Sequence, residues 1–359
     1  MAKKPTVEVT FRQMATTMIE RSERGVAALI IKDTTDNTEY KEYRDAAALA
    51  ADEDKYTPEN LQAIRDVLAK APYKVAVVRA PEQGVASAFS VIEEHLTACW
   101  VAFAELDAAN QTDLIAWAKK KEQETKSYNA LVYKAASPDN KQIVNFTTEK
   151  VTFADERGEK SGDTYIPALL GRIAAANIQK SITYGVCEDL IGCTETEDET
   201  GAVENGELIL SNVGGTVRIV SGCNSLTTLN GKTLTQDMQY IETVEAMQIL
   251  IDDIRDEWHR NYLGNYRNSY DNQMLFVGAV DGYLRELERI DVLDPEYENR
   301  AYIKAEAQRN AWISSGHTEA EQWPDSKVVR TPYKRNVYLA MDIKILGSME
   351  NIQLIVNMF

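Results

Sequence analysis

The sequence predicts two domains in a chain of 359 residues, one a layered α/β fold and the other an α+β fold. Short apolar strands alternate with single amphipathic helices between residues 58 and 178, which favours parallel pairing of the strands. Two long amphipathic helices follow between residues 241 and 290, and the chain ends on residues with the two-residue period of a strand. We therefore expect the α/β domain at residues 26–235 and an α+β domain built from the chain on either side of it.

The elements of the α/β domain are predicted from the spacing of apolar residues. Buried strands are expected at residues 25–31, 74–78, 99–103, 129–133 and 143–146, and helices at 59–70, 84–96, 110–124 and 165–178. Residues 33–56 are polar and predict a loop with a short Ala-rich helix. Residues 189–204 predict an acidic, exposed excursion. A hairpin is expected at 208–220, because Asn212-Val213-Gly214-Gly215 separates two apolar runs.

The second domain is predicted from two stripes of apolar residues at helical spacing. The first stripe, before Gly264, comprises Ile241, Val244, Ile251, Ile254, Trp258 and Tyr262. The second, in a helix that begins near Ser269 or Asp271, comprises Phe276, Val280, Tyr283, Leu287 and Ile290. A shorter helix is expected at 301–313, and residues 337–346 alternate as a strand.

Both ends of the chain have the pattern of a strand with one apolar face. The apolar positions are Val7, Val9 and Phe11 near the N-terminus and Ile352, Leu354 and Val356 near the C-terminus. An apolar strand in water aggregates unless another strand pairs with it. Two pairings are open for the C-terminal strand: a hairpin with residues 337–346 of its own chain, or addition to the sheet of another subunit. The residues alone favour the hairpin, because neighbouring strands usually pair locally.

The net charge of −17 limits the classes of partner. Nucleic acid requires a basic protein surface, and an anionic membrane does too, so neither is expected as a partner. No stretch has the length of a transmembrane helix, and no apolar signal core follows the first residues, so we expect a protein made in a reducing cytoplasm. The cysteines Cys99, Cys187, Cys193 and Cys223 lack zinc-binding spacing and are expected to be buried as small apolar residues.

No sequence motif for catalysis or cofactor binding rises above background. The three histidines are His95, His259 and His317. None has a second histidine four residues away on a helix, so no metal site is predicted. Gly231-Lys232-Thr233 resembles the end of a phosphate-binding loop, but Leu226 stands where the first glycine is needed, so a turn is expected. The carboxylates at 252–253 and 256–257 are expected on the solvated side of the first long helix.

We therefore predict no catalytic residue, no metal and no cofactor. A soluble cytoplasmic α/β enzyme with an unrecognised active site is the alternative, because catalytic residues can assemble from distant parts of a sequence.

Several stretches, taken in order, resemble the contractile tail sheath proteins of bacteriophages and phage-like bacteriocins. They are most similar to the short sheaths of defective prophages and of diffocin-type bacteriocins. The stretches are TTMIERSERG at 16–25, IVNFTTE at 143–149, the segments 206–210, 217–220 and 224–229, residues 253–272, and KILGSMENI at 344–352. Their order and spacing carry the resemblance, which extends over nearly the whole chain.

The resemblance implies a structural protein and not an enzyme. In the family, hexameric rings of sheath stack around an inner tube, and contraction on a baseplate drives the tube through a cell envelope. The implied partners are further copies of this chain, the inner tube protein, and the baseplate and tail terminator proteins, without nucleic acid or membrane contact by this subunit. Also implied are synthesis in the bacterial cytoplasm, assembly into the tail of a virion or phage-like particle, and release on lysis.

The resemblance also assigns roles to parts of the chain. Residues 1–25 become the N-terminal arm and the start of the assembly domain, 26–235 the α/β outer domain, 236–346 the C-terminal α+β assembly domain, and 347–359 the C-terminal arm. The outer domain is subtilisin-like by fold, without a catalytic triad. In the family the arms complete the sheets of neighbouring subunits, so pairing of residues 350–359 with another subunit replaces the hairpin as the expectation.

Six residues are then candidates for the arm interfaces: Val7, Val9, Phe11, Ile352, Leu354 and Val356. The family's tube-contacting segment lies in the C-terminal domain. The residues assigned to it here are Arg300, Lys304 and Arg309, in and beside the helix expected at 301–313.

Overall fold

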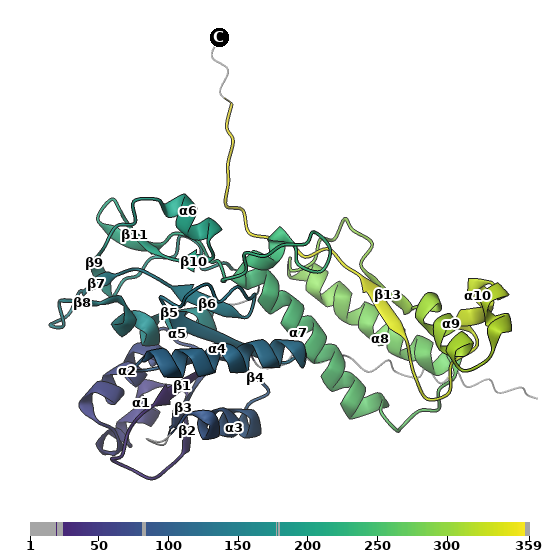
Figure 1. The fold of residues 1–359 in the computed structure, drawn as a ribbon, viewed down its shortest axis with the longest axis horizontal. Coiled ribbons are helices and arrows are strands. Elements are labelled where there is room, and N and C mark those ends of the chain that lie inside the picture. The colour runs from purple at the N-terminus through teal and green to yellow at the C-terminus, as the bar shows by residue number, and fades with distance from the viewer. Residues whose placement is uncertain (1–18, 20–23, 81–83, 177, 179, 356–359) are drawn as a thin grey trace, which may run out of the picture. The chain divides into compact units, whose positions relative to one another are not determined.

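The computed structural model describes residues 19, 24–80, 84–176, 178 and 180–355 and has the mixed α/β architecture that the sequence predicts. The described residues fall into two compact units. The larger unit is drawn from 22–252 and 345–359, and the smaller contains residues 253–344. The division falls inside one long helix, α7, as Figure 1 shows by its continuous ribbon.

A seven-stranded sheet forms the centre of the larger unit, in the order β10-β6-β5-β4-β1-β3-β2. Its strands are β1 (Val26–Ile31), β2 (Tyr40–Tyr43), β3 (Lys74–Arg79), β4 (Ala98–Phe103), β5 (Ser127–Tyr133), β6 (Ile143–Phe146) and β10 (Glu207–Leu208). Neighbouring strands run parallel except β2, which runs antiparallel to β3 at one edge. The parallel pairing predicted from helix–strand alternation is therefore confirmed.

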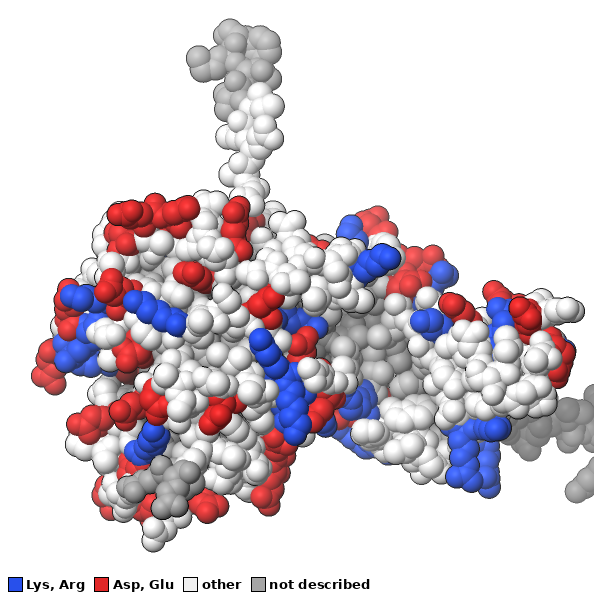
Figure 2. Space-filling model, in the orientation of Figure 1, with Lys and Arg blue, Asp and Glu red and all other residues white. Residues whose placement is uncertain are grey.

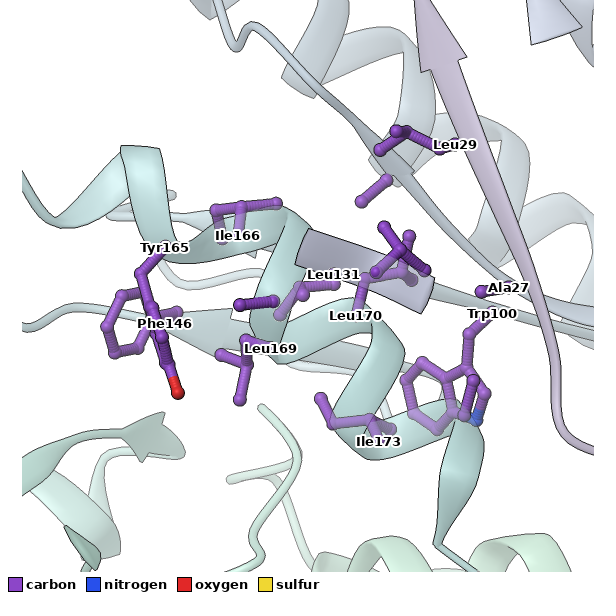
Figure 3. Close-up of a cluster of buried hydrophobic side chains, with 14 of the residues drawn as sticks. Ala27, Leu29, Trp100, Leu131, Phe146, Tyr165, Ile166, Leu169, Leu170 and Ile173 are labelled. Atoms are coloured by element: carbon purple, nitrogen blue, oxygen red, sulfur yellow. The ribbon is translucent and has the colours of Figure 1, made fainter. Parts of the chain in front are cut away.

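Helices cover both faces of this sheet, because the side chains of its strands alternate between two apolar clusters. On one face Ala27 and Leu29 pack with helices α2 (Pro58–Leu68) and α5 (Ile166–Ala175). Figure 3 shows this cluster, in which α5 presents a row of apolar side chains to the strands. On the other face Ala28 and Ile30 pack with α3 (Ala86–His95) and α4 (Ala108–Gln123).

Smaller elements complete the larger unit. They are α1 (Ala46–Ala50), β7 (Lys150–Phe153), β8 (Glu159–Ser161), β9 (Leu190–Cys193), α6 (Glu199–Glu204), β11 (Leu210–Val213), β12 (Thr216–Ile219), and 3-10 turns at Glu53–Lys55, Gly162–Tyr165 and Gln236–Gln239. Strands β11 and β12 form the predicted hairpin. Its turn requires glycine, because Gly214 and Gly215 have φ angles of 61° and 81°.

The smaller unit begins with the end of α7 (Ile241–Glu257), which continues into a π-helical turn at Trp258–Tyr262. Its other elements are α8 (Tyr270–Arg289), β13 (Arg300–Ile303), α9 (Ala305–Ser314), a 3-10 turn at Thr318–Gln322, α10 (Asp325–Val329) and β14 (Leu339–Asp342). Ser269 caps α8, as the sequence predicts, by accepting a hydrogen bond from the Asn272 N–H. Strands β13 and β14 pair antiparallel.

Several sequence expectations are wrong in detail. The segment 33–56 contains strand β2, and Arg300–Ile303 is a strand where a helix was expected from residue 301. The acidic excursion contains β9 and α6 and so is partly ordered by pairing with β7. Residues 350–355 form no strand, so the described part of the C-terminal segment makes no hairpin with residues 337–346.

The carboxylates of α7 are also placed differently from the expectation. Asp253 and Glu257 are buried, because Tyr283 of α8 donates its hydroxyl hydrogen to Asp253 at 2.5 Å and Asn261 donates to Glu257 at 2.9 Å. In contrast, Ile251 of the predicted apolar stripe is exposed.

Candidate assembly surface

The outer edge of β13 is occupied by a side chain of its own unit. The Ala301 N–H points away from β14 and donates to Asp281 Oδ1 of α8 at 2.7 Å. A carboxylate that accepts a backbone N–H at this position leaves no room for a further strand beside Ala301. If the two-stranded sheet grows, it must therefore grow from β14.

The outer edge of β14 has no hydrogen-bond partner among the described residues. Lys304 N donates to Tyr338 O at 2.8 Å, which shows that residues 338, 340 and 342 direct their backbone groups toward β13. In an antiparallel ladder successive residues point to opposite sides. The N–H and C=O groups of Leu339 and Met341 therefore point to the open side, as on the edge strand of an incomplete sheet.

An apolar groove of about 220 Å³ lies between this sheet and the helices of the same unit. It is lined by Ile254, Trp258, Phe276, Val280, Ala301, Val337, Leu339, Ala340 and Met341, and none of these side chains is charged. Opposite each other in the ladder, Ala301 is buried but Met341 is only half-buried. The apolar surface of the groove therefore extends to the side chains of β14, the last strand of this sheet among the described residues.

The C-terminal segment, residues 347–359, carries exposed apolar side chains in its described part, 347–355. The exposed fractions are 89% for Ile352 and 76% for Leu354, and Met349 is fully exposed. Figure 1 shows the described part of this segment as an extended trace whose far end projects away from the helices and strands, and Figure 2 shows it as largely uncharged. Of the residues assigned to the arms, Val356, Val7, Val9 and Phe11 lie outside the described residues.

The residues assigned to the tube contact are only partly brought together. Arg300 lies on β13 and pairs with Glu298 at 3.1 Å. Lys304 stands at the start of α9, and Arg309 lies within that helix, where it pairs with Asp325 at 2.6 Å. Two of the three cations therefore already have a carboxylate partner, and both carboxylates are well exposed.

The described residues contain no group of three or more histidine, cysteine or carboxylate side chains able to hold a metal ion. All three histidines are exposed. Asn230 Oδ1 accepts the backbone N–H groups of residues 232–234, so Gly231-Lys232-Thr233 is a turn, as expected. Three of the four cysteines are buried and Cys193 is partly so. No helix among the described residues has both the length and the apolar character to span a bilayer.

One half-buried carboxyl, that of Glu245, has a strongly altered acidity. Burial raises the pKa of Glu245 to about 7, against the opposing effects of the Trp100 indole N–H, which donates to it, and of the Arg24 charge. Glu245 lies on α7 and Trp100 on β4, so this contact fastens the helix to the central sheet. The periodicity of α7 gives no sign of it, because the partner is a side chain 145 residues away.

Comparisons with known proteins place this fold among tail sheaths. Residues 233–359, which include β13, β14 and the C-terminal segment, match the model of the phage tail sheath C-terminal domain. A curated tail sheath protein of Clostridium phage phiCD119 is 28% identical over 367 aligned residues, with all of both chains covered.

Solved structures give the same result for the fold. The contracted helical sheath of the anti-feeding prophage matches with a TM-score of 0.73 at 12% identity, covering 99% of each chain. The sheath tail protein of Desulfitobacterium hafniense matches with a TM-score of 0.69 at 11% identity, covering 95% of this chain and 100% of the other. Together with the sequence matches, these structures confirm the resemblance to contractile tail sheath proteins.

Proposed function

We propose that this chain, which resembles contractile tail sheath proteins from end to end, is the structural subunit of such a sheath. The observation that carries the proposal is the combination of an open, apolar-backed strand edge at β14 with an uncovered apolar segment at the C-terminus. Each feature is unfavourable in an isolated monomer and each is satisfied by the other when chains associate. We assign the chain no catalytic role.

In the proposed sheath, copies of this chain form hexameric rings that stack around an inner tube and contract on a baseplate. Residues 26–235 act as the outer domain, and residues 1–25 and 236–346 form the assembly domain. The tail terminator protein closes the far end of the sheath. The chain is made in the bacterial cytoplasm and leaves the cell with the particle on lysis.

The C-terminal arm adds to β14 of another copy as a further strand. Ile352, Leu354 and Val356 share one face of an extended strand, and on that face they cover the apolar groove. Burial contributes roughly 1.5–3 kcal/mol for each fully buried side chain, and the backbone hydrogen bonds fix the register. The same register places Asn351, Gln353, Ile355 and Asn357 on the opposite face.

Two further contacts belong to the proposal. Val7, Val9 and Phe11 form the N-terminal arm, which pairs with a neighbouring subunit in the same way. Arg300, Lys304 and Arg309 face the inner tube, where the tube's acidic groups replace Glu298 and Asp325 as their partners. These exposed ion pairs are weak enough to exchange, since such pairs contribute about 0–1 kcal/mol.

Deletion of residues 350–359 tests the proposal. We expect the purified variant to be a folded monomer, because the apolar side chains of Ile352, Leu354 and Ile355 that it removes are exposed, and to form no tubes in negative-stain microscopy while the full chain does. Leu354→Asp should have the same effect by placing an unpaired charge in the neighbour's groove. Asn357→Asp is the matched control, because it adds the same charge on the opposite face of the strand. Tubes formed by the deletion variant as readily as by the full chain would contradict the proposal.

A further inference from the structure

Each terminal segment is bonded to the same helix, α7, at the end where it joins the rest of the chain. At the C-terminal end, Ser348 makes two hydrogen bonds to Glu242 of α7: its N–H donates to Oε1 at 2.9 Å and its hydroxyl to Oε2 at 2.6 Å. At the N-terminal end, the Arg24 guanidinium forms an ion pair with Asp252 of α7 at 2.7 Å. All four residues belong to the larger unit.

One contact has two hydrogen bonds and the other is partly buried, which distinguishes both from single exposed pairs. A carboxylate that accepts two hydrogen bonds from one residue fixes the direction of that residue as well as its position. Glu242 also lies in the first turn of α7, where a negative charge is favoured by the helix dipole. The side chains of Arg24 and Asp252 are 22% and 13% exposed, so solvent screens their attraction only in part.

The helix between these two contacts is held rigidly on the central sheet. Asn129 of β5 and Gln248 of α7 exchange two amide hydrogen bonds, at 2.8 and 2.9 Å, and both side chains are buried. Glu245, one turn earlier, accepts the indole N–H of Trp100 on β4. Positions 245, 248 and 252 lie on one side of α7, so the helix meets the sheet and Arg24 along a single polar stripe.

We propose that α7 is the common anchor of the two arms and that Glu242 and Asp252 are positioning residues for assembly. Ten residues separate these positions, which corresponds to roughly 15 Å along a helix. Because these hydrogen bonds fasten α7 to the sheet, this spacing sets where each arm leaves the subunit, and hence how the subunit is joined to two neighbours. The inference rests on the proposed function, because it concerns arms that pair with other copies.

The C-terminal contact is tested with Glu242→Ala and Ser348→Ala. Ser348 is exposed, and its side-chain hydroxyl bonds only to Glu242 among the described residues, so the fold does not depend on it. We expect each variant to keep the circular dichroism spectrum and the unfolding midpoint of the parent, and to form at least tenfold fewer tubes or tubes with an altered helical rise and twist. Asp256→Asn is the control, because it removes an exposed carboxylate from the same helix.

The N-terminal contact is tested by exchanging its charges. Arg24→Asp alone places two carboxylates together and should reduce tube formation, whereas the double variant Arg24→Asp with Asp252→Arg should restore it. If the single variant does not fold, the Ser348 and Glu242 variants alone decide the matter. Tubes of normal number and normal helical parameters from Glu242→Ala and Ser348→Ala would overturn the inference. The 350–359 deletion in the same assay separates the two proposals, since it tests the arm itself and not its root.

Discussion

The central seven-stranded sheet and the two-stranded sheet of β13 and β14 differ in how their apolar faces and strand edges are covered. The central sheet has helices on both faces, and its described edges are short, with two residues in β10 and four in β2. The two-stranded sheet has helices on one side, and among the described residues no strand covers the edge of β14 or the apolar groove. An isolated pair of strands is at best marginally stable in water. The comparison teaches that the larger unit covers both faces of its sheet within one chain, whereas the smaller unit, on the proposed function, gains from a strand supplied by another.

The largest effect is expected from a change in the complete sheet's core. Leu170 of α5 is fully buried in the cluster shown in Figure 3. Leu170→Ala removes apolar contacts and leaves a cavity, so the free energy of unfolding should fall by about 2–5 kcal/mol. Urea unfolding followed by circular dichroism measures this. Leu339→Ala in the half-buried edge strand is the comparison, and an equal loss there would show that the two sheets do not differ as described.

A proline on β14 should affect assembly more than folding. The Met341 N–H points away from β13 and has no partner among the described residues, so Met341→Pro removes a donor that an added strand needs. We expect a folded monomer and at least a tenfold loss of tubes by negative-stain microscopy. Ala340→Pro is the matched variant, because the Ala340 N–H points toward β13, and this change should instead lower the stability of the monomer. Normal tubes from Met341→Pro would mean that β14 does not receive a strand.

A smaller effect is expected on how the free energy of unfolding changes with pH, through Glu245, which joins α7 to the central sheet. The folded pKa of Glu245 is about 7, above its ordinary value of 4.5, so the folded chain binds this proton more tightly than the unfolded chain. The stabilisation is complete below pH 4.5 and is lost as the pH rises to about 7. Glu245→Gln still accepts the Trp100 N–H and does not ionise.

The stability of Glu245→Gln relative to the parent should therefore increase by roughly 1–3 kcal/mol between pH 5 and pH 8. Urea unfolding of both proteins at the two pH values measures the difference. Glu94→Gln, at an exposed position on α3, is the control. A difference between Glu245→Gln and the parent that does not change with pH would show that Glu245 titrates as an ordinary carboxyl.

The sequence predicts the central sheet well because its strands and helices carry uninterrupted apolar patterns. It does not predict β2, because the polar sequence of Tyr40–Tyr43 is typical of a loop. This segment is a strand through its pairing with β3. The sequence misses β13 because Arg300–Ile303 runs directly into a helix, although the alternation of exposed and buried side chains there is a strand signal. Burial of Asp253 depends on Tyr283, which lies on another helix.

The candidate assembly surface is only partly visible in the sequence for a related reason. The apolar period of residues 352–356 indicates a strand, but a period contains no information on which chain supplies the partner. Asp281 of α8 accepts the Ala301 N–H at the outer edge of β13, and this contact leaves β14 as the edge to which a strand can be added. No local pattern around residue 281 reveals that contact.

In the proposed sheath, the Asp281 contact also gives the polymer a polarity. A sheet that receives a strand on one side only gives each subunit a single acceptor for the C-terminal arm and a single such arm to donate. Subunits joined in this way all face in one direction, so a row of them has two unlike ends: one displays an empty acceptor and the other an unplaced arm. Growth from a starting platform and closure by a different protein at the far end then require different surfaces, and one carboxylate on α8 is enough to distinguish them.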